Sequence, residues 1–220
     1  MPTGSTSFIW VSMYKGHIGL TLSVILISSM LSPFIVPSMT LFTVAKVKID
    51  FWDMMMGLFM MIVIPSILGM VLNNMTHGTI KTVLGDKLAP FAKLSLIFII
   101  TINGAKVVPF FKDVDSSIFK IAIVVVLLAG TGYLLGFIIS TICKWDKEIK
   151  VSLIFNGGIR NLGAGTVLAL TYFPLPVLLP IIIAMLFEQL LASLCAMMIK
   201  RFGSNANTKT NKKIPSQINY

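Results

Sequence analysis

The side chains best suited to chemistry gather in one apolar stretch, at 156–161. Asn156, Arg160 and Asn161 supply two amides and a guanidinium, and Gly157-Gly158 stands between them. Amides, a fixed positive charge and freed backbone groups can together bind an ion or an anionic substrate. A charged side chain at the centre of a membrane helix costs about 2.5–3.5 kcal/mol, so such groups must face protein or a water-filled cavity. We predict a helix that is broken around Gly157-Gly158 and lines a cavity.

The glycines of this stretch also permit a simpler interpretation. Gly158, Gly163 and Gly165 could form a small-residue face that packs against a neighbouring helix. Packing explains the glycines but does not explain a cluster of Asn, Arg and Asn in an apolar segment. We therefore favour the cavity.

A second group of candidate ligands opens the chain. Proline, glycine and hydroxyl residues at 2–7 precede a short apolar stretch at 8–13, which is too short to cross a bilayer. This pattern predicts the second half of another broken helix, with the hydroxyls of Ser5, Thr6 and Ser7 available to coordinate a cation or to cap the helix. An ordinary flexible N-terminus with a serine cap is the alternative, and residue chemistry alone does not separate the two.

The elements that position these residues are membrane helices. Hydrophobic residues make up 56% of the 220 residues and charged residues only 12%, where soluble domains have about 25%. Six apolar segments have the length of a span, at 18–44, 51–73, 90–111, 117–143, 151–172 and 175–199. Pro33 and Pro37 predict a kink in the first segment or its early exit from the membrane near the outer end. The fold class is all-α, a polytopic membrane helical bundle of about six spans plus a half-helix.

The distribution of positive charge predicts the topology. With the C-terminus inside, the inside segments carry eleven Lys and Arg residues and the outside loops three, namely Lys46, Lys48 and Lys112. We expect a transmembrane domain at 1–200, in contact with the lipid bilayer of the cytoplasmic membrane, and a disordered basic cytoplasmic tail at 201–220. The net charge of +10 is thus a topology signal, and no nucleic-acid motif accompanies it.

Several motifs resemble the bile acid:sodium symporter family. Pro2-x-Gly4 with its hydroxyl run, Lys15-Gly16 and Leu31-Ser32-Pro33-Phe34 are similar to the family's fourth and fifth helices. The family's broken ninth helix and its last span are matched by Gly158-Ile159-Arg160-Asn161, Tyr172-Phe173-Pro174 and Met185-Leu186-Phe187-Glu188-Gln189. The resemblance covers residues 2 to about 201.

The resemblance implies a fold of about ten spans in two inverted repeats, with helices four and nine broken and crossing at the midplane. By this comparison the chain holds the second half of helix four, helix five and the second repeat. We expect a native transporter to require the remaining helices, and the 220-residue chain alone to be unable to transport.

The resemblance also places ion ligands. Ser7 and Thr21 match hydroxyl ligands of the family's sodium sites, an acidic ligand falls on Asn156 and a Gln ligand on Arg160. Loss of the acid and gain of a cation argue against strict sodium dependence, so Ser7, Thr21 and Asn156 form at most a weak Na⁺ site, and no other cofactor is expected. The full set of predicted substrate- or ion-binding residues is Thr6, Ser7, Thr21, Asn156, Gly157, Ile159, Arg160, Asn161 and Glu188.

Arg160 and Glu188 are predicted to lie at one depth. Each stands fourteen residues from Pro174, the turn between the last two predicted spans. Because Arg is always protonated, a buried Arg160 needs a partner, and Glu188 is the carboxylate at that depth. Three hypotheses remain: a salt bridge between the two, an anion-binding Arg160, or an Arg160 that occupies a cation's place.

The sequence favours a secondary transporter of a small organic anion that works by alternating access, with sodium coupling through a degraded site left open. The alternatives are a non-transport membrane assembly subunit or an inactive truncated transporter fragment. An intramembrane enzyme is disfavoured, because no paired aspartates, Ser/His dyad or zinc motif lies within the spans. The identity of the substrate, the direction of transport and the oligomeric state are not determined by the sequence.

Overall fold

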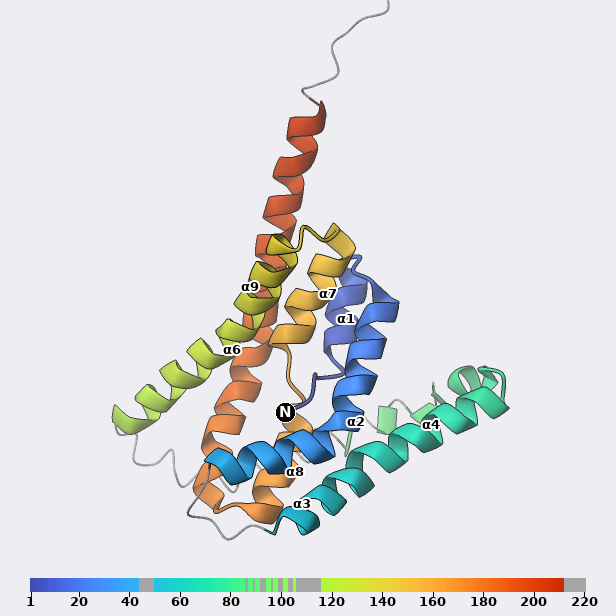
Figure 1. Ribbon diagram of the computed structural model, residues 1–220, viewed down its shortest axis with the longest axis vertical. Coiled ribbons are helices and arrows are strands. Elements are labelled where there is room, and N and C mark those ends of the chain that lie inside the picture. The colour runs from blue at the N-terminus through green and yellow to red at the C-terminus, as the bar shows by residue number, and fades with distance from the viewer. Residues whose placement is uncertain are drawn as a thin grey trace, which may run out of the picture.

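The computed structural model describes residues 1–43, 50–85, individual positions between 87 and 105, and 116–211. The described elements are helices: α1 Ser7–Met13, α2 Ile18–Thr43, α3 Phe51–Leu58, the π-helical turn η1 Phe59–Val63, α4 Ile64–Met75, η2 Lys81–Gly85, α6 Ser116–Ile142, α7 Lys147–Gly158, α8 Leu162–Tyr172, the 3₁₀ turn η3 Leu175–Val177 and α9 Leu178–Asn211. Figure 1 shows α1, α7 and α9 running side by side, with one end of α6 packed on α7 and α9 before the helix slopes away, while α4 extends away from this group.

Four helical stretches are long and apolar enough to cross a membrane, and they confirm four of the predicted spans. They are Ile18–Thr43, Phe51–Met75, Ile118–Ile142 and Leu175–Lys200. The predicted span at 90–111 lies largely outside the described residues. The predicted span at 151–172 is divided between α7 and α8, so the described part of the chain is the predicted all-α bundle with one discontinuous helix.

The kink predicted in α2 is present. Pro33 and Pro37 lie inside the helix, and Figure 1 shows the helix bending. Pro33 has no N–H to bond the carbonyl of Ser29, but the hydroxyl of Ser32 donates to that carbonyl at 2.8 Å. A side-chain hydroxyl thus satisfies the backbone group that the proline frees, as membrane helices require.

The main core lies where α1, α6, α7 and α9 meet. Its buried members are Val11, Tyr133, Val151, Ile154, Phe155, Ile159, Ala192 and Ala196. Phe155 is fully buried and lies against two rings of α1, with centroids 5.8 Å from Trp10 and 6.0 Å from Tyr14. This core fixes α1 against the N-terminal half of the broken helix.

The glycine pair of α7 packs against α6, and the predicted discontinuity follows directly after it. A Cβ on Gly157 would lie 2.7 Å from the carbonyl oxygen of Gly132, and one on Gly158 would overlap the ring of Tyr133. Both glycines are helical, and the helix ends directly after them. Close packing therefore explains Gly157-Gly158, while the break is made by residues 159–161.

The two ends of the bundle are defined by contacts between turns. At one end, the amide of His17 donates to the carbonyl of Glu148 at 3.1 Å and joins the α1–α2 turn to α7. At the other, the hydroxyl of Tyr172 donates to the carbonyl of Asp53 at 2.9 Å and joins α8 to α3. α9 leaves the bundle at the first end (Figure 1) and stays helical to Asn211, beyond the predicted boundary at 200. Residues 212–220 of the predicted tail lie outside the described part of the chain.

Candidate functional site at the crossing of two unwound segments

Two non-helical segments cross in the middle of the bundle, one before α1 and one between α7 and α8. Thr3 and Arg160 form an isolated antiparallel bridge. The amide of Gly4 donates to the carbonyl of Ile159 at 3.0 Å, and the amide of Asn161 donates to the carbonyl of Pro2 at 2.9 Å. Each segment therefore supplies the hydrogen bonds that the other loses by leaving the helical conformation, which is a requirement at membrane depth.

The crossing is tight enough to require glycine at position 4. A Cβ on Gly4 would lie 2.7 Å from the carbonyl oxygen and 2.9 Å from the carbonyl carbon of Arg160. Both are backbone atoms, so they cannot rotate away. The Pro-x-Gly motif at the start of the chain thus has a packing reason.

Beside the crossing lies a buried polar group formed by α1, α2 and α7. Ser7 and Thr21 are fully buried, and Asn156 is 4% exposed. The amide nitrogen of Asn156 donates to the Thr21 hydroxyl at 3.4 Å, and the Thr3 hydroxyl donates to the backbone carbonyl of Asn156 at 3.3 Å. The hydroxyl of Thr21 in turn donates to the carbonyl of His17 at 3.2 Å.

Two oxygens of this group have no hydrogen-bond partner. They are Ser7 Oγ and the side-chain Oδ1 of Asn156, and both are buried. A buried unpaired oxygen is costly, so each position favours a water molecule or a hard cation as a partner. The three predicted sodium ligands are thus buried, and two of them are in direct contact, but all three side chains are neutral.

The remaining predicted site residues have local structural roles. The side chain of Asn161 caps α8 by accepting from the amide of Ala164 at 3.1 Å. Thr6 stands at the N-cap position of α1 without a capping bond from its side chain. Ile159 is fully buried and contributes its backbone carbonyl to the crossing, and Gly157 packs against α6 as described above.

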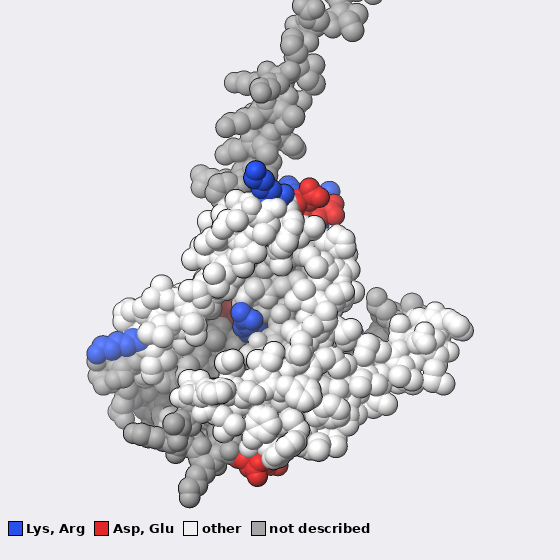
Figure 2. Space-filling model, viewed as in Figure 1, with Lys and Arg blue, Asp and Glu red and all other residues white. Residues whose placement is uncertain are grey.

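Arg160 and Glu188 meet, but not through the salt bridge that was one of the three hypotheses. Carboxylate oxygen Oε1 of Glu188 accepts a hydrogen bond from the backbone amide of Arg160 at 3.0 Å. The side chain of Arg160 is exposed and makes no ion pair with Glu188. Figure 2 shows a basic patch beside a partly covered acidic one in the middle of the face, surrounded by uncharged side chains, while the other charged groups lie toward the edges of the view. The two residues are therefore neighbours, as counting from Pro174 indicated, and the group that joins them is the backbone amide of Arg160.

Sequence reasoning missed two contributors to this region. Thr3 bridges the two unwound segments by pairing with Arg160 and bonding to Asn156. The ring of Tyr133 packs on Gly158, and its hydroxyl is buried without a partner. The hydroxyl residue inside the Pro-x-Gly motif was an available signal for Thr3, but a tyrosine within an apolar span gave none for Tyr133.

The chain is similar in sequence to one protein family and to two proteins of Bacillus subtilis. The model of the Sodium Bile acid symporter family matches residues 1–113. The chain is 48% identical over 203 residues, 92% of its length, to the uncharacterized protein YbaS of Bacillus subtilis (strain 168), of which it covers 66%. It is 25% identical over 173 residues, 78% of its length, to the uncharacterized sodium-dependent transporter YocS of the same organism, of which it covers 53%. The chain therefore spans between half and two thirds of these relatives.

The family match includes the opening Pro-x-Gly motif, α1 and α2. These supply one of the two crossing segments and the buried hydroxyls of Ser7 and Thr21. The match to YbaS extends over nearly the whole chain, so it also includes most of the helices that complete the crossing. The chain belongs to the Sodium Bile acid symporter family.

Proposed function

We propose that the chain forms the substrate-binding core of a secondary transporter, which moves a small organic anion across the cytoplasmic membrane by alternating access. The observation that carries this proposal is the crossing of segments 2–4 and 159–161 in the middle of the bundle. Secondary transporters place their binding sites at such interruptions near the midplane, where unwound backbone and helix ends meet the substrate.

The charge at the crossing favours an anionic substrate. The exposed guanidinium of Arg160 stands directly before the N-terminus of α8, whose helix dipole also presents positive charge. Glu188 is engaged by the Arg160 amide, and this leaves the guanidinium of Arg160 outside an ion pair with it. A carboxylate or sulfate on the substrate would complement both positive groups.

We further propose that transport does not require sodium. The group at Ser7, Thr21 and Asn156 offers neutral oxygens to a cation, with no carboxylate among them. Arg160, which follows Asn156 by four positions, supplies a permanent positive charge. Weak sodium coupling is the second candidate, and the two unpaired oxygens of Ser7 and Asn156 favour it.

Uptake into liposomes tests both proposals. The chain, joined to the segments of the Bacillus subtilis relative YbaS that the match leaves uncovered, would be assayed with a panel of labelled organic anions, with sodium present or replaced by choline. We expect uptake without sodium, strong impairment by Arg160→Gln and partial retention in Arg160→Lys. Lys120→Gln, a change to an exposed cation on α6, is the matched control and should leave uptake unchanged.

Each proposal has its own contrary result. Strict sodium dependence would refute the sodium-free scheme and support the weak site at Ser7, Thr21 and Asn156. Full uptake by Arg160→Gln would remove the anion-binding role of Arg160. Uptake of none of the anions by a folded protein would favour a non-transport membrane subunit.

A further inference from the structure

A deep groove lies between α6, α7 and α9, at the end of the bundle where α6 and α7 are connected. Its volume is about 620 Å³, and its wall is almost entirely apolar. Residues that line it include Leu134, Phe137, Ile154, Leu191, Leu194 and Met198. Leu134, Leu194 and Met198 are each more than half exposed, so the groove is open on the side of the bundle. No residue of the two unwound segments lines it, and Tyr133 is the residue that it shares with the region of the crossing.

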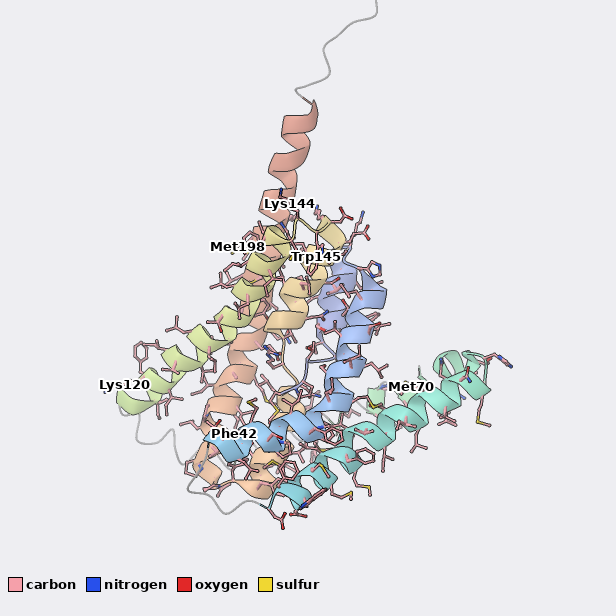
Figure 3. All side chains as sticks on the ribbon, viewed as in Figure 1. Phe42, Met70, Lys120, Lys144, Trp145 and Met198 are labelled. Carbon is pink, nitrogen blue, oxygen red and sulfur yellow. The ribbon has the colours of Figure 1, made fainter. Side chains whose placement is uncertain are left out.

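Two lysines and a tryptophan stand at the mouth of the groove. Lys147, Lys150 and Trp145 line it, whereas the neighbouring acidic residues Asp146 and Glu148 do not. The ammonium of Lys150 lies over the ring of Phe137, 5.5 Å from its centroid, which holds this charge at the groove. Figure 3 shows Lys144, Trp145 and Met198 close together at this end of the bundle.

The groove has the depth of one membrane leaflet. It extends along α6 to Gly130, twelve residues before the helix ends at Ile142, or about 18 Å along the axis. Half of a hydrocarbon core of about 30 Å is close to that distance. Trp145 then lies at the level of the headgroups, where tryptophan is enriched.

We propose that this groove binds one anionic phospholipid, with its phosphate between Lys147 and Lys150 and an acyl chain against α6 and α9. In a bilayer the hydrophobic effect does not drive an acyl chain into an apolar groove, because the surrounding lipid is as apolar as the wall of the groove. The lysines therefore decide the occupant, and they select an amphiphile with a negative headgroup. Basic pockets between helices at the cytoplasmic surface are the recognised form of such sites.

Quenching of tryptophan fluorescence by brominated lipids tests the proposal on the full 220-residue chain. The chain would carry Trp10→Phe and Trp52→Phe, which leave Trp145 as the one remaining tryptophan of the three in the sequence. In nanodiscs of phosphatidylcholine, brominated phosphatidylglycerol should quench Trp145 at a several-fold lower mole fraction than brominated phosphatidylcholine does. Each lysine near an anionic headgroup accounts for about a fivefold preference.

Two variants separate a site from general attraction to the surface. The double variant Lys147→Gln/Lys150→Gln should lose the preference for phosphatidylglycerol. Lys144→Gln/Lys200→Gln removes the same charge near the same end but outside the groove, and it should keep most of the preference. Gly130→Leu should also lose the preference for phosphatidylglycerol. A Cβ at this position meets no atom within 4 Å, so the leucine side chain can enter the space that the acyl chain would occupy.

Three outcomes would overturn the proposal. An equal loss of the preference for phosphatidylglycerol in the two double variants would show that the charge of the whole surface, and not the groove, attracts the lipid. An absent preference in the parent would show that lysines do not select the occupant. A stable dimer that protects Trp145 from both lipids would show that a second copy of the chain covers the groove.

Discussion

Replacing Glu188 tests how α9 holds the broken helix. Its Oε1 accepts from the Arg160 backbone amide at 3.0 Å. Glu188→Gln keeps an acceptor oxygen at that position, so the bond survives in neutral form, and we expect a change within about 1 kcal/mol. Glu188→Met keeps the length of the side chain but has no comparable acceptor. It leaves the Arg160 amide unpaired, which should lower the free energy of unfolding by about 1–3 kcal/mol.

A double-mutant cycle distinguishes this backbone bond from a salt bridge. Because the donor is the backbone amide of residue 160, Arg160→Gln keeps the hydrogen bond to Glu188. The effects of Arg160→Gln and Glu188→Met on the free energy of unfolding should therefore add within about 0.5 kcal/mol. A buried salt bridge would instead cost about 3–5 kcal/mol when broken on one side, with strong coupling between the two changes.

Equilibrium unfolding in mixed micelles, with denaturing detergent as the variable, measures all four proteins of the cycle. Glu148→Gln is the control, because Glu148 is an exposed carboxylate near the start of α7. Its effect should be within about 0.5 kcal/mol of zero. A coupling energy of 1 kcal/mol or more in the cycle would contradict the backbone bond and restore the ion pair.

Three further predictions follow from the crossing and the topology. Gly4→Ala should destabilise the chain by about 1–3 kcal/mol through overpacking against a backbone, while Gly69→Ala, in open space on α4, should stabilise it slightly in the same unfolding assay. Asn156→Asp should create a sodium-dependent rise in thermal stability that potassium does not reproduce; no such rise would show that the buried oxygens do not form a cation site. In a background without the native cysteines, Asn207→Cys should resist a membrane-impermeant thiol reagent in intact cells, and Asp115→Cys, outside the described residues, should react; the reverse pattern would invert the topology.

Local sequence features were enough to predict the broken helix. Polar residues and glycines inside an apolar stretch cannot form an ordinary lipid-facing span, so a discontinuity near 157 followed from chemistry alone. Which residues are unwound, however, depends on what each of them contacts in the folded structure. Gly157 and Gly158 lie in the helix and pack closely on α6, and the chain unwinds at 159–161, where Pro2 and Gly4 offer backbone partners.

The same division applies to the buried polar group. Hydroxyl and amide types at 7, 21 and 156 indicated possible ligands, but their sequence positions are up to 149 residues apart, taking 156 minus 7. Their burial together depends on α1, α2 and α7 packing against one another, and the core around Phe155 holds α1 on α7. The hydrogen bond between Asn156 and Thr21 is a product of that packing.

Composition and charge determined by themselves that this is a membrane helical bundle, because apolar segments of span length have no other stable environment. Counting from Pro174 also determined the common depth of Arg160 and Glu188, because rise per residue fixes depth in antiparallel helices. Only the tertiary structure decided which atom of Arg160 bonds to Glu188. In an intact helix the backbone amide of Arg160 would bond to a carbonyl of the preceding turn. Unwinding at 159–161 frees this amide, and the carboxylate of Glu188 accepts its hydrogen bond and not one from the guanidinium.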